Sequence, residues 1–416
     1  MAAWQSSILS VSQPSFLSLI RHKRDGGIHS REDLDLIAQA ASSGSVPDYQ
    51  LSAWLMAAFL KGMNPQETAD LTLAMAASGE RMDLSSLAKP WVDKHSTGGV
   101  GDKTTLVLLP LLASCGLTMV KMSGRGLGIT GGTIDKLESI PGFRTDLSPE
   151  EMIAQARVVG CALTGQTPRL APADKALYSL RDVTATVDSI PLIVASILSK
   201  KIAGGAETVV LDIKCGAGAF MKTLDQAEAL RSALEEVGAL AGLKVKAAIT
   251  DMDQPLGRMV GNALEVKEAL RVLRLEEKGR FADLCLWMAK EALDTLGMDP
   301  DLADENMSNG GALQMAMHWV HAQKGSIDVF DDEDWCPAKV VRPLIWQGAS
   351  GWVSRVAADK VGELVLDLGG GRRTKTDQID HSVGLELKVE VGDRVEPGQE
   401  VAVLHAGNDR EVSLDW

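Results

Sequence analysis

Short apolar runs that alternate with helix-forming segments are the feature that most restricts the fold of this chain. Three of these runs have the length and composition of buried strands, at residues 117–122, 208–214 and 243–250. A glycine-rich turn or a helix-forming segment such as residues 224–240 follows each of them. Because neighbouring parallel strands are joined by crossover helices, this alternation predicts a largely parallel sheet covered by helices.

The first part of the chain has the pattern of helices rather than strands. Ser30 followed by Asp33 resembles a capping box, in which two side chains satisfy free N–H groups at a helix start. This helix and the next are expected to end at Gly44 and Gly62. A further apolar helix is predicted over residues 189–203, with no strand of its own. We expect it to join the N-terminal helices, which makes the domains discontinuous in sequence.

After about residue 345 the sequence changes to short β-forming runs separated by turn residues, at 348–358, 362–374 and 384–406. The predicted class is therefore α/β, with a small all-α domain, a large α/β domain with a mixed, largely parallel sheet, and a β-rich C-terminal module. The predicted domains are residues 1–75 and 172–204 (helical), 76–171 and 205–345 (α/β), and 346–416 (C-terminal module).

Composition excludes several classes of function. The 416 residues carry a net charge of −14, which argues against binding to nucleic acid or to a membrane surface. No apolar run is long enough for a membrane span, and the first residues lack the pattern of a signal peptide. Five scattered cysteines without Cys-x-x-Cys spacing indicate a reducing compartment. We expect a cytoplasmic protein.

The first glycine loop, residues 94–105 (KHSTGGVGDKTT), has the composition of an anion site. It fails the spacing of a nucleotide-binding P-loop, because Asp102 stands before Lys103 where a glycine is required. Its three glycines allow backbone N–H groups to converge on an oxyanion, and the following helix would point its N-terminus at the same place. Lys94, Ser96 and Thr105 add a charge and two hydroxyl donors.

A second glycine loop lies at residues 123–143 and contains Gly126-x-Gly128-x-x-Gly131 after an apolar run. This spacing formally matches a dinucleotide-binding fingerprint, but it occurs late in the chain and after another anion loop. The surrounding side chains are hydrogen-bond donors, namely Ser123, Arg125, Thr130 and Thr133. The simpler alternative for both loops is a pair of tight turns between strands and helices.

A third group of polar residues comprises Tyr178, Arg181, Ser196 and Lys200. Ser196 and Lys200 are four residues apart and therefore share one helix face. The planar fork of Arg181 and the compact ammonium of Lys200 suit a ring edge that bears carbonyl oxygens. The alternative for Lys200 is ordinary surface charge at a helix end.

The three groups together resemble the pyrimidine-nucleoside phosphorylase and thymidine phosphorylase family. The matching motifs are KHSTGGVGD at residue 94, SGRGLG with TGGT and DKLE from residue 123, and LYSLRDVTATVDSIPLI from residue 177. The resemblance extends over nearly the whole chain. It implies a homodimer, a cleft between the α and α/β domains that closes on substrates, and phosphorolysis of uridine, thymidine or deoxyuridine to the free base and (deoxy)ribose 1-phosphate.

The resemblance also implies roles for individual residues, with inorganic phosphate as co-substrate and no organic cofactor. His95, Arg181 and Lys200 would be catalytic. The phosphate would be held by Lys94, Ser96, Thr105, Lys121, Ser123 and Thr133, and the pyrimidine by Tyr178, Arg181, Ser196 and Lys200. A lysine at position 121, two residues before Ser123, favours an enzyme that accepts both uridine and thymidine.

Members of this family bind a potassium ion, and the matching positions here are Gly101, Lys103, Leu256, Met259 and Glu268. Where some members have threonine this chain has Lys103, whose ammonium would crowd or replace the ion. The chain also departs from the family at Ile129, where members often have histidine.

Two other functions remain open from the sequence. Anthranilate phosphoribosyltransferases are related, but they need an acidic pair for a magnesium-bound diphosphate, which we do not see in this sequence. A catalytically silent nucleoside-binding protein is the second alternative, if Lys103 and Ile129 disable the chemistry. A metal site at His318 and His321 is not expected, since no further ligand stands at useful spacing.

Overall fold

A computed structural model describes residues 14–126, 128–167, 169–374 and 376–409. Most of the N-terminal stretch that was tested for a signal peptide lies outside these ranges. The chain forms two compact units, one within Met1–Glu80 and Pro168–Lys200 and the other within Arg81–Thr167 and Lys201–Trp416. The boundaries predicted from the sequence stay predictions, and a separate C-terminal module within the second unit stays a proposal.

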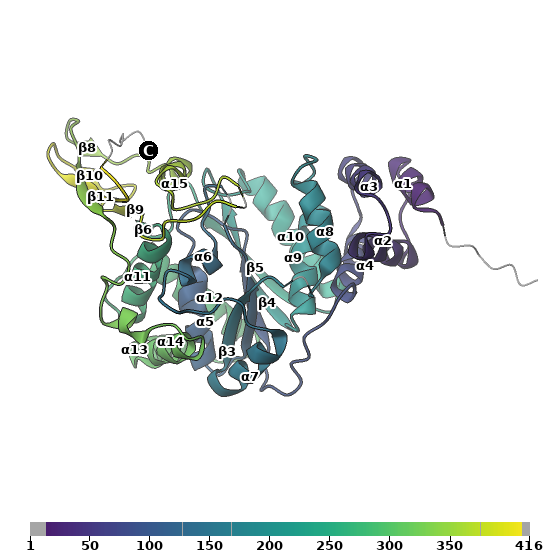
Figure 1. Ribbon diagram of the computed structural model, residues 1–416, viewed down its shortest axis with the longest axis horizontal. Coiled ribbons are helices and arrows are strands. Elements are labelled where there is room, and N and C mark those ends of the chain that lie inside the picture. The colour runs from purple at the N-terminus through teal and green to yellow at the C-terminus, as the bar shows by residue number, and fades with distance from the viewer. Residues whose placement is uncertain (1–13, 127, 168, 375, 410–416) are drawn as a thin grey trace, which may run out of the picture. The chain divides into compact units, whose positions relative to one another are not determined.

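The first unit consists of helices packed around an apolar core (Figure 1). Ser30 and Asp33 form the predicted capping box, and Gly44 ends that helix in the left-handed conformation. Trp54 on the following helix is completely buried in this core. The helices are α1 (Phe16–Arg24), α2 (Arg31–Ser43), α3 (Asp48–Lys61), α4 (Pro65–Ala77), α8 (Pro172–Arg181) and α9 (Ile190–Ala203), whose last residues belong to the second unit.

The second unit is built on two adjoining parallel sheets, β1-β4-β5 and β2-β3, which together give the strand order β3-β2-β1-β4-β5. A parallel bridge between Trp91 and Thr118 joins β1 to β2. The three apolar runs predicted as strands correspond to β2, β4 and β5. The strands are β1 (Val92–Ser96), β2 (Met119–Ser123), β3 (Cys161–Gly165), β4 (Thr208–Cys215) and β5 (Lys244–Asp251).

Strand order explains where the helices lie. From β1 the chain moves outward to β2 and β3, and later it returns to the other side of β1 for β4 and β5. Since parallel crossovers are right-handed, this reversal places α5 and α10 on opposite faces of the sheet (Figure 1). The helices of this unit before residue 345 are α5 (Thr104–Ser114), α6 (Thr133–Leu137), α7 (Pro149–Val159), α10 (Leu224–Leu240), α11 (Asn262–Leu273), α12 (Arg280–Thr295), α13 (Asp301–Ser308), α14 (Gly311–Ala322) and the one-turn 3-10 helix Ile327–Phe330.

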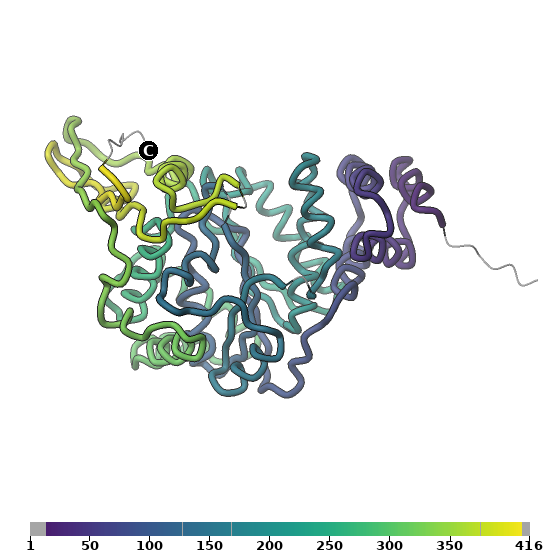
Figure 2. Tube along the Cα trace, in the orientation of Figure 1, coloured from purple at the N-terminus to yellow at the C-terminus, as the bar shows by residue number. Residues whose placement is uncertain are grey.

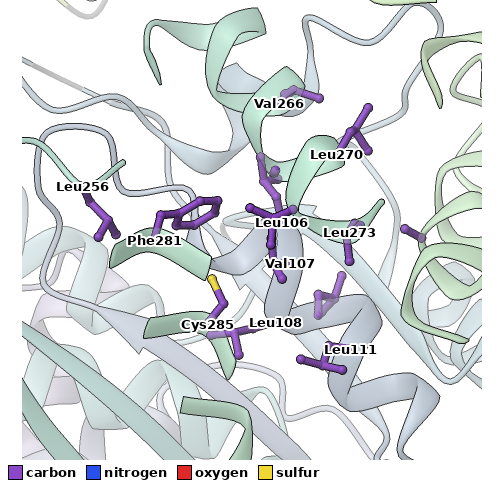
Figure 3. Close-up of a cluster of buried hydrophobic side chains, with 14 of the residues drawn as sticks. Leu106, Val107, Leu108, Leu111, Leu256, Val266, Leu270, Leu273, Phe281 and Cys285 are labelled. Atoms are coloured by element: carbon purple, nitrogen blue, oxygen red, sulfur yellow. The ribbon is translucent and has the colours of Figure 1, made fainter. Parts of the chain in front are cut away.

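Helix α5 is the centre of the apolar core of this unit. Its residues from Thr104 to Ala113 are all buried, which fits a helix with apolar neighbours on every side. Figure 3 shows side chains from α5, α11 and α12 gathered in one cluster, among them Leu106, Leu270 and Phe281. The first glycine loop therefore leads directly into a helix whose position is fixed by packing on every side.

The C-terminal part contains short antiparallel strands and one helix. Strand β11 pairs with both β9 and β7, and Figure 2 shows its yellow trace returning beside the green segment of β7. The prediction of β structure over 362–374 is wrong at its start, because residues 358–367 form helix α15 with Val361 and Val365 buried on one face. The elements are β6 (Met259–Val260), β7 (Val340–Ile345), β8 (Gly351–Trp352), α15 (Ala358–Asp367), β9 (Gly384–Leu387), β10 (Arg394–Val395) and β11 (Glu400–Ala406).

The predicted fold class is confirmed: a helical part, an α/β part with a parallel sheet, and a β-rich C-terminal region. Among the residues that the structure describes, no helix is both long and apolar enough to cross a membrane.

Candidate active site

The first glycine loop lies at the point where the strand order of the sheet reverses. Strand β1 ends at Ser96, α5 begins at Thr104, and the neighbouring β4 belongs to the other half of the sheet. In open α/β sheets, ligands bind outside the carboxyl ends of the strands at this switch point. Gly98 and Gly101 have φ angles of +87° and +76°, which only glycine adopts readily, so the loop can turn its N–H groups as an anion site requires.

Lys94 carries a buried ammonium at this loop. Its side chain is 2% exposed, and its Nζ donates to the Thr104 hydroxyl and lies 3.9 Å from Asp102 Oδ1. Burial would raise the pKa of Asp102, but the nearby ammonium groups of Lys94, Lys214 and Lys136 hold it well below its usual range. One carboxylate therefore serves several cations, and Lys94 has no close carboxylate of its own.

The other lysines near Asp102 are paired more closely. Lys214 lies 2.6 Å from Asp212, and both side chains are fully buried. Lys136 lies 2.7 Å from Glu265 and also donates to the main-chain carbonyl of Asp102. Their charges are compensated within the protein, which leaves Lys94 as the buried cation with the weakest partner in this cluster.

The predicted phosphate residues next to Lys94 differ in their contacts. Ser96 Oγ accepts from the N–H of Gly98 at 3.2 Å, within the loop. Thr105 is buried, and its hydroxyl has no hydrogen-bond partner among the described residues, whereas Thr104 bonds to both Lys94 and Asp102. The half-buried His95 follows Lys94 on β1, so strand alternation places the two side chains on opposite faces of the sheet.

Lys121 on β2 is the second buried lysine of the predicted phosphate group. Its Nζ lies 3.2 Å from Asp93 Oδ1 and also donates to the main-chain carbonyl of Lys94. Burial lowers the pKa of Lys121 to about 7, against the opposing attraction of Asp93. Asp93 is shared with Lys201, 2.6 Å away. Lys121 thus braces β1 directly beneath the glycine loop.

Ser123 and Thr133 are the predicted phosphate residues of the second glycine loop. Ser123 is the last residue of β2, and Thr133 is the first residue of α6. Both are half-buried, and neither hydroxyl makes a hydrogen bond within the described ranges. Both are therefore free to donate to a ligand.

Asp135 holds the backbone of the second loop in place. Its fully buried carboxylate accepts from the Gly126 N–H at 2.6 Å and from Arg372 Nη1 at 2.7 Å. The Gly128 N–H donates in turn to the carbonyl of Arg372 at 2.8 Å. These two amides already have protein acceptors, so they do not offer the free N–H groups that a dinucleotide pyrophosphate needs. The dinucleotide interpretation finds no support here.

Ile129 lies against the C-terminal helix α15. A Cβ added at Gly362 of that helix would meet the Ile129 carbonyl oxygen at 2.8 Å and its Cβ at 3.0 Å. The loop and the helix therefore pack closely at the position where the chain departs from the family pattern.

The helical unit carries the residues predicted to bind the pyrimidine. Lys200 on α9 donates to Ser196 Oγ at 2.9 Å, which confirms that the two side chains share one helix face. Lys200 also pairs with Asp174 on α8, and its side chain remains 21% exposed. Lys200 is therefore not an isolated surface charge. Tyr178 is exposed, and its ring centroid lies 5.7 Å from the Arg181 guanidinium carbon.

Arg181 is more engaged with its own chain than the sequence indicated. The guanidinium donates to the carbonyls of Thr186 at 3.1 Å, Leu192 at 2.9 Å and Val187. Burial lowers the pKa of Arg181, which still stays charged. Three of its five N–H donors thus fix the turn between α8 and α9, and two are left for a ligand. Arg181 therefore has fewer N–H donors available to a ligand than expected from the sequence.

The residues matched to a potassium site do converge, but on Lys103. Its Nζ lies 2.6 Å from the carbonyl oxygen of Leu256, 2.9 Å from that of Met259 and 3.1 Å from that of Gly101. Glu268 Oε2 is 2.7 Å away. An ammonium already fills the centre of these oxygens, so the residues do not fit an additional ion. The potassium site implied by the family resemblance stays a prediction, with Lys103 at its centre.

Sequence reasoning missed the acidic partners of these lysines: Asp93, Asp102, Asp174 and Asp212. A signal was present for Asp212, which stands within the apolar run 208–214, where a carboxylate needs a cation. His318 and His321 are exposed on α14, and no group of three or more metal-ligating side chains occurs in the described part of the chain.

Models of known protein families match most of the chain. The "Glycosyl transferase family, a/b domain" matches residues 88–313, and the helical bundle domain of the same family matches residues 17–79. The "Pyrimidine nucleoside phosphorylase C-terminal domain" matches residues 352–414.

Individual relatives point the same way. The pyrimidine-nucleoside phosphorylase of Geobacillus stearothermophilus is 48% identical over 401 residues, covering 95% of this chain and 92% of the relative. That of Bacillus subtilis (strain 168) is 45% identical over 399 residues, covering 94% and 92%. The crystal structure of anthranilate phosphoribosyltransferase from Thermus thermophilus has a TM-score of 0.59 and 19% identity, covering 74% of this chain and 99% of that one. At that identity the likeness concerns the fold alone. The identity to the phosphorylases runs along nearly the full length of both chains, and this chain belongs to the pyrimidine-nucleoside phosphorylase family.

Proposed function

We propose that this chain catalyses the phosphorolysis of pyrimidine nucleosides. A nucleoside and inorganic phosphate give the free base and pentose 1-phosphate. The observation that carries the proposal is the buried ammonium of Lys94 at a glycine loop, on a sheet switch point, with its nearest carboxylate 3.9 Å away. A dianion such as hydrogen phosphate would supply the missing negative charge. The sequence identity to phosphorylases along nearly the whole chain supports phosphate as this anion.

We assign the phosphate to the α/β unit. The ammonium of Lys94 and those backbone N–H groups of the first loop that have no protein acceptor would hold its oxygens, and Ser123 and Thr133 have hydroxyls free to donate. Ser96, Thr105 and Lys121 complete the predicted set. Of these, Ser96 and Lys121 already bond to the chain and would act mainly by shaping the loop.

We assign the pyrimidine to Tyr178, Arg181, Ser196 and Lys200 of the helical unit. In the reaction the C1′–N1 bond breaks and its electron pair leaves with the base, while a phosphate oxygen forms the new bond to C1′. The proton of hydrogen phosphate ends on N1 of the base, so atoms and charge balance. The sugar gains oxocarbenium character as the bond stretches, as in glycoside cleavage.

Catalysis in this scheme needs no activated side-chain nucleophile. Phosphate is itself the nucleophile, and holding both reactants in line can supply several kcal/mol, about 7 or more in well-oriented cases. The two remaining N–H donors of Arg181 and the ammonium of Lys200 would stabilise the negative charge that develops on the base. His95 would act near the reacting centre. Because Lys121 stands two residues before Ser123, we propose that uridine and thymidine are both substrates.

We further propose a homodimer in the cytoplasm. All five cysteines are unpaired thiols, which is typical of a reducing compartment. Size-exclusion chromatography with light scattering would give the oligomeric state.

The test of the function is release of free base. The protein is incubated with phosphate and, separately, with uridine, thymidine, deoxyuridine and cytidine, in the presence of EDTA. We expect base release from uridine, thymidine and deoxyuridine that requires phosphate and no magnesium. Absence of release from all of these nucleosides would contradict the proposal.

A further inference from the structure

The ammonium of Lys103 is surrounded by protein oxygens in the manner of a bound metal ion. Its side chain is completely buried. Three main-chain carbonyls, those of Leu256, Met259 and Gly101, lie at 2.6 to 3.1 Å, and the Glu268 carboxylate lies at 2.7 Å. An ammonium has three N–H donors and here faces four acceptors, so every donor is satisfied.

This oxygen shell is held together by the protein around it. The Glu268 carboxylate accepts from the N–H groups of Arg258 at 2.7 Å and Met259 at 2.9 Å, which fixes its orientation. The N–H of Leu256 donates to the Val100 carbonyl at 3.1 Å, which ties the segment to the first glycine loop. On another side the ring centroid of Phe281 lies 4.9 Å from Nζ (its place in the core is shown in Figure 3).

The charge of the shell matches a single positive charge. One carboxylate carries −1, and the three carbonyl oxygens are neutral dipoles. Divalent ions such as calcium are bound by six to eight oxygens, usually with several carboxylates. The shell therefore suits a monovalent cation, and Lys103 provides one that is covalently attached.

We propose that Lys103 is a built-in cation that replaces a free monovalent ion in this enzyme. Its ammonium joins Gly101 of the phosphate loop to the segment 256–259, so the loop keeps its shape without potassium from solution. The contact is close, since a Cβ added at Gly101 would meet the Leu256 carbonyl oxygen at 2.7 Å. Without a cation, one buried carboxylate and three carbonyls would face one another uncompensated, which is costly in the protein interior.

The proposal predicts that a smaller neutral residue creates a requirement for an added cation. Lys103→Thr removes the ammonium and leaves room inside the same oxygen shell. Two quantities are measured in potassium chloride and in tetramethylammonium chloride at equal ionic strength: the thermal unfolding midpoint and kcat/KM for uridine phosphorolysis. The unfolding measurement does not depend on the proposed function, whereas the kinetic measurement rests on it.

We expect the wild type to give the same midpoint and the same kcat/KM in both salts. In tetramethylammonium, Lys103→Thr should lose about tenfold or more in kcat/KM, the range seen when supporting contacts of a site are removed. Potassium should restore its activity with a saturating dependence and raise its midpoint by about 2 °C or more.

Two control variants separate a cation site from a general loss of stability. Lys103→Met fills the space with an apolar side chain and should not be rescued by potassium. Lys136→Thr removes an equally buried ammonium that has one carboxylate and only one carbonyl partner, and it should not be rescued either. A wild type that needs potassium would overturn the proposal. So would a Lys103→Thr variant with equal midpoints in the two salts. If that variant does not fold in either salt, the wild-type comparison still decides.

Discussion

Two buried lysines at the same glycine loop have opposite surroundings. The ammonium of Lys103 contacts three carbonyls and a carboxylate within 3.1 Å. That of Lys94 donates to one threonine hydroxyl, and its nearest carboxylate is 3.9 Å away and shared with other lysines. Lys103 is saturated by the protein, whereas Lys94 is not.

The difference separates a structural cation from a binding cation. A buried charge must be compensated, and a charge that the protein compensates fully gains little from a ligand. Lys94 remains able to gain from an incoming anion. Proximity to the loop does not distinguish the two lysines, because residues 94 and 103 flank the same glycines. Their partners do.

The largest effect is expected at Lys94. Lys94→Gln keeps a polar side chain but removes the charge that faces the anion. We expect kcat/KM for phosphate to fall by about 100- to 1000-fold, roughly 3–4 kcal/mol. The matched control is Lys214→Gln, which removes an ammonium that is already paired with Asp212 at 2.6 Å. Steady-state kinetics at varied phosphate should show a much smaller loss for the control, and equal losses would remove the distinction between saturated and unsaturated lysines.

Arg181 is intermediate between the saturated Lys103 and the unsaturated Lys94, because three of its N–H donors are bound to carbonyls and two are left. We expect Arg181→Ala to lower kcat/KM for uridine by about 30- to 1000-fold, or 2–4 kcal/mol. Arg181→Lys keeps the charge but loses the fork that holds the turn, so its loss should be intermediate. Limited proteolysis between α8 and α9 reports the loosening of the turn separately. An unchanged kcat/KM in Arg181→Ala would exclude this residue from the mechanism.

Asp135 is a carboxylate whose partners all belong to the protein, so any effect of its substitution on activity must come from the position of the second glycine loop. Asp135→Asn weakens the contacts with Gly126 and Arg372 and should raise the KM for phosphate about tenfold, with a smaller change in kcat. Glu138→Gln is the control. Glu138 pairs with Arg125, but both side chains are partly exposed, and exposed ion pairs contribute little to stability. Similar kinetics for Asp135→Asn and wild type would show that the loop needs no such anchor.

Lys121 is expected to affect stability, with little effect on the rate. The pKa of Lys121 is lowered to about 7 in the folded protein, while an unfolded lysine keeps its proton up to about 10.4. Between these values the unfolded chain binds more protons, so the contribution of Lys121 to the free energy of unfolding rises with pH, by up to about 1.4 kcal/mol per pH unit. Denaturant unfolding from pH 6.5 to 9.5 should show a shallower rise in Lys121→Met than in the wild type. Identical slopes would contradict a shifted lysine.

Local sequence patterns predicted most of the fold. The capping box at Ser30, the glycine helix ends and the three apolar strands depend on neighbours within a few residues, which a pattern can show. Helix α15 was missed because its apolar residues Leu364, Val365 and Leu366 also fit a short strand when read alone. Family resemblance, not spacing, brought the residues around Lys103 to attention.

The partners of the site residues could not be predicted in the same way. Lys103 and Leu256 are 153 residues apart in sequence, and Lys201 and Asp93 are 108 apart. Which carboxylate compensates which lysine depends on strand order and on the return of the chain beside β1. The same holds for Arg181, whose use of three carbonyls follows from the path of the turn after α8 rather than from residue type. These contacts decide whether a lysine or arginine is available to a ligand.

The role of Lys94 in phosphate binding is tested most directly by calorimetric titration of inorganic phosphate into the wild type, Lys94→Gln and Lys214→Gln at constant ionic strength. We expect phosphate to bind the wild type and Lys214→Gln with similar affinity and to bind Lys94→Gln at least about tenfold more weakly, a loss of roughly 1.4 kcal/mol or more. Equal affinity of the wild type and Lys94→Gln would contradict the claim that the unsaturated lysine holds the phosphate.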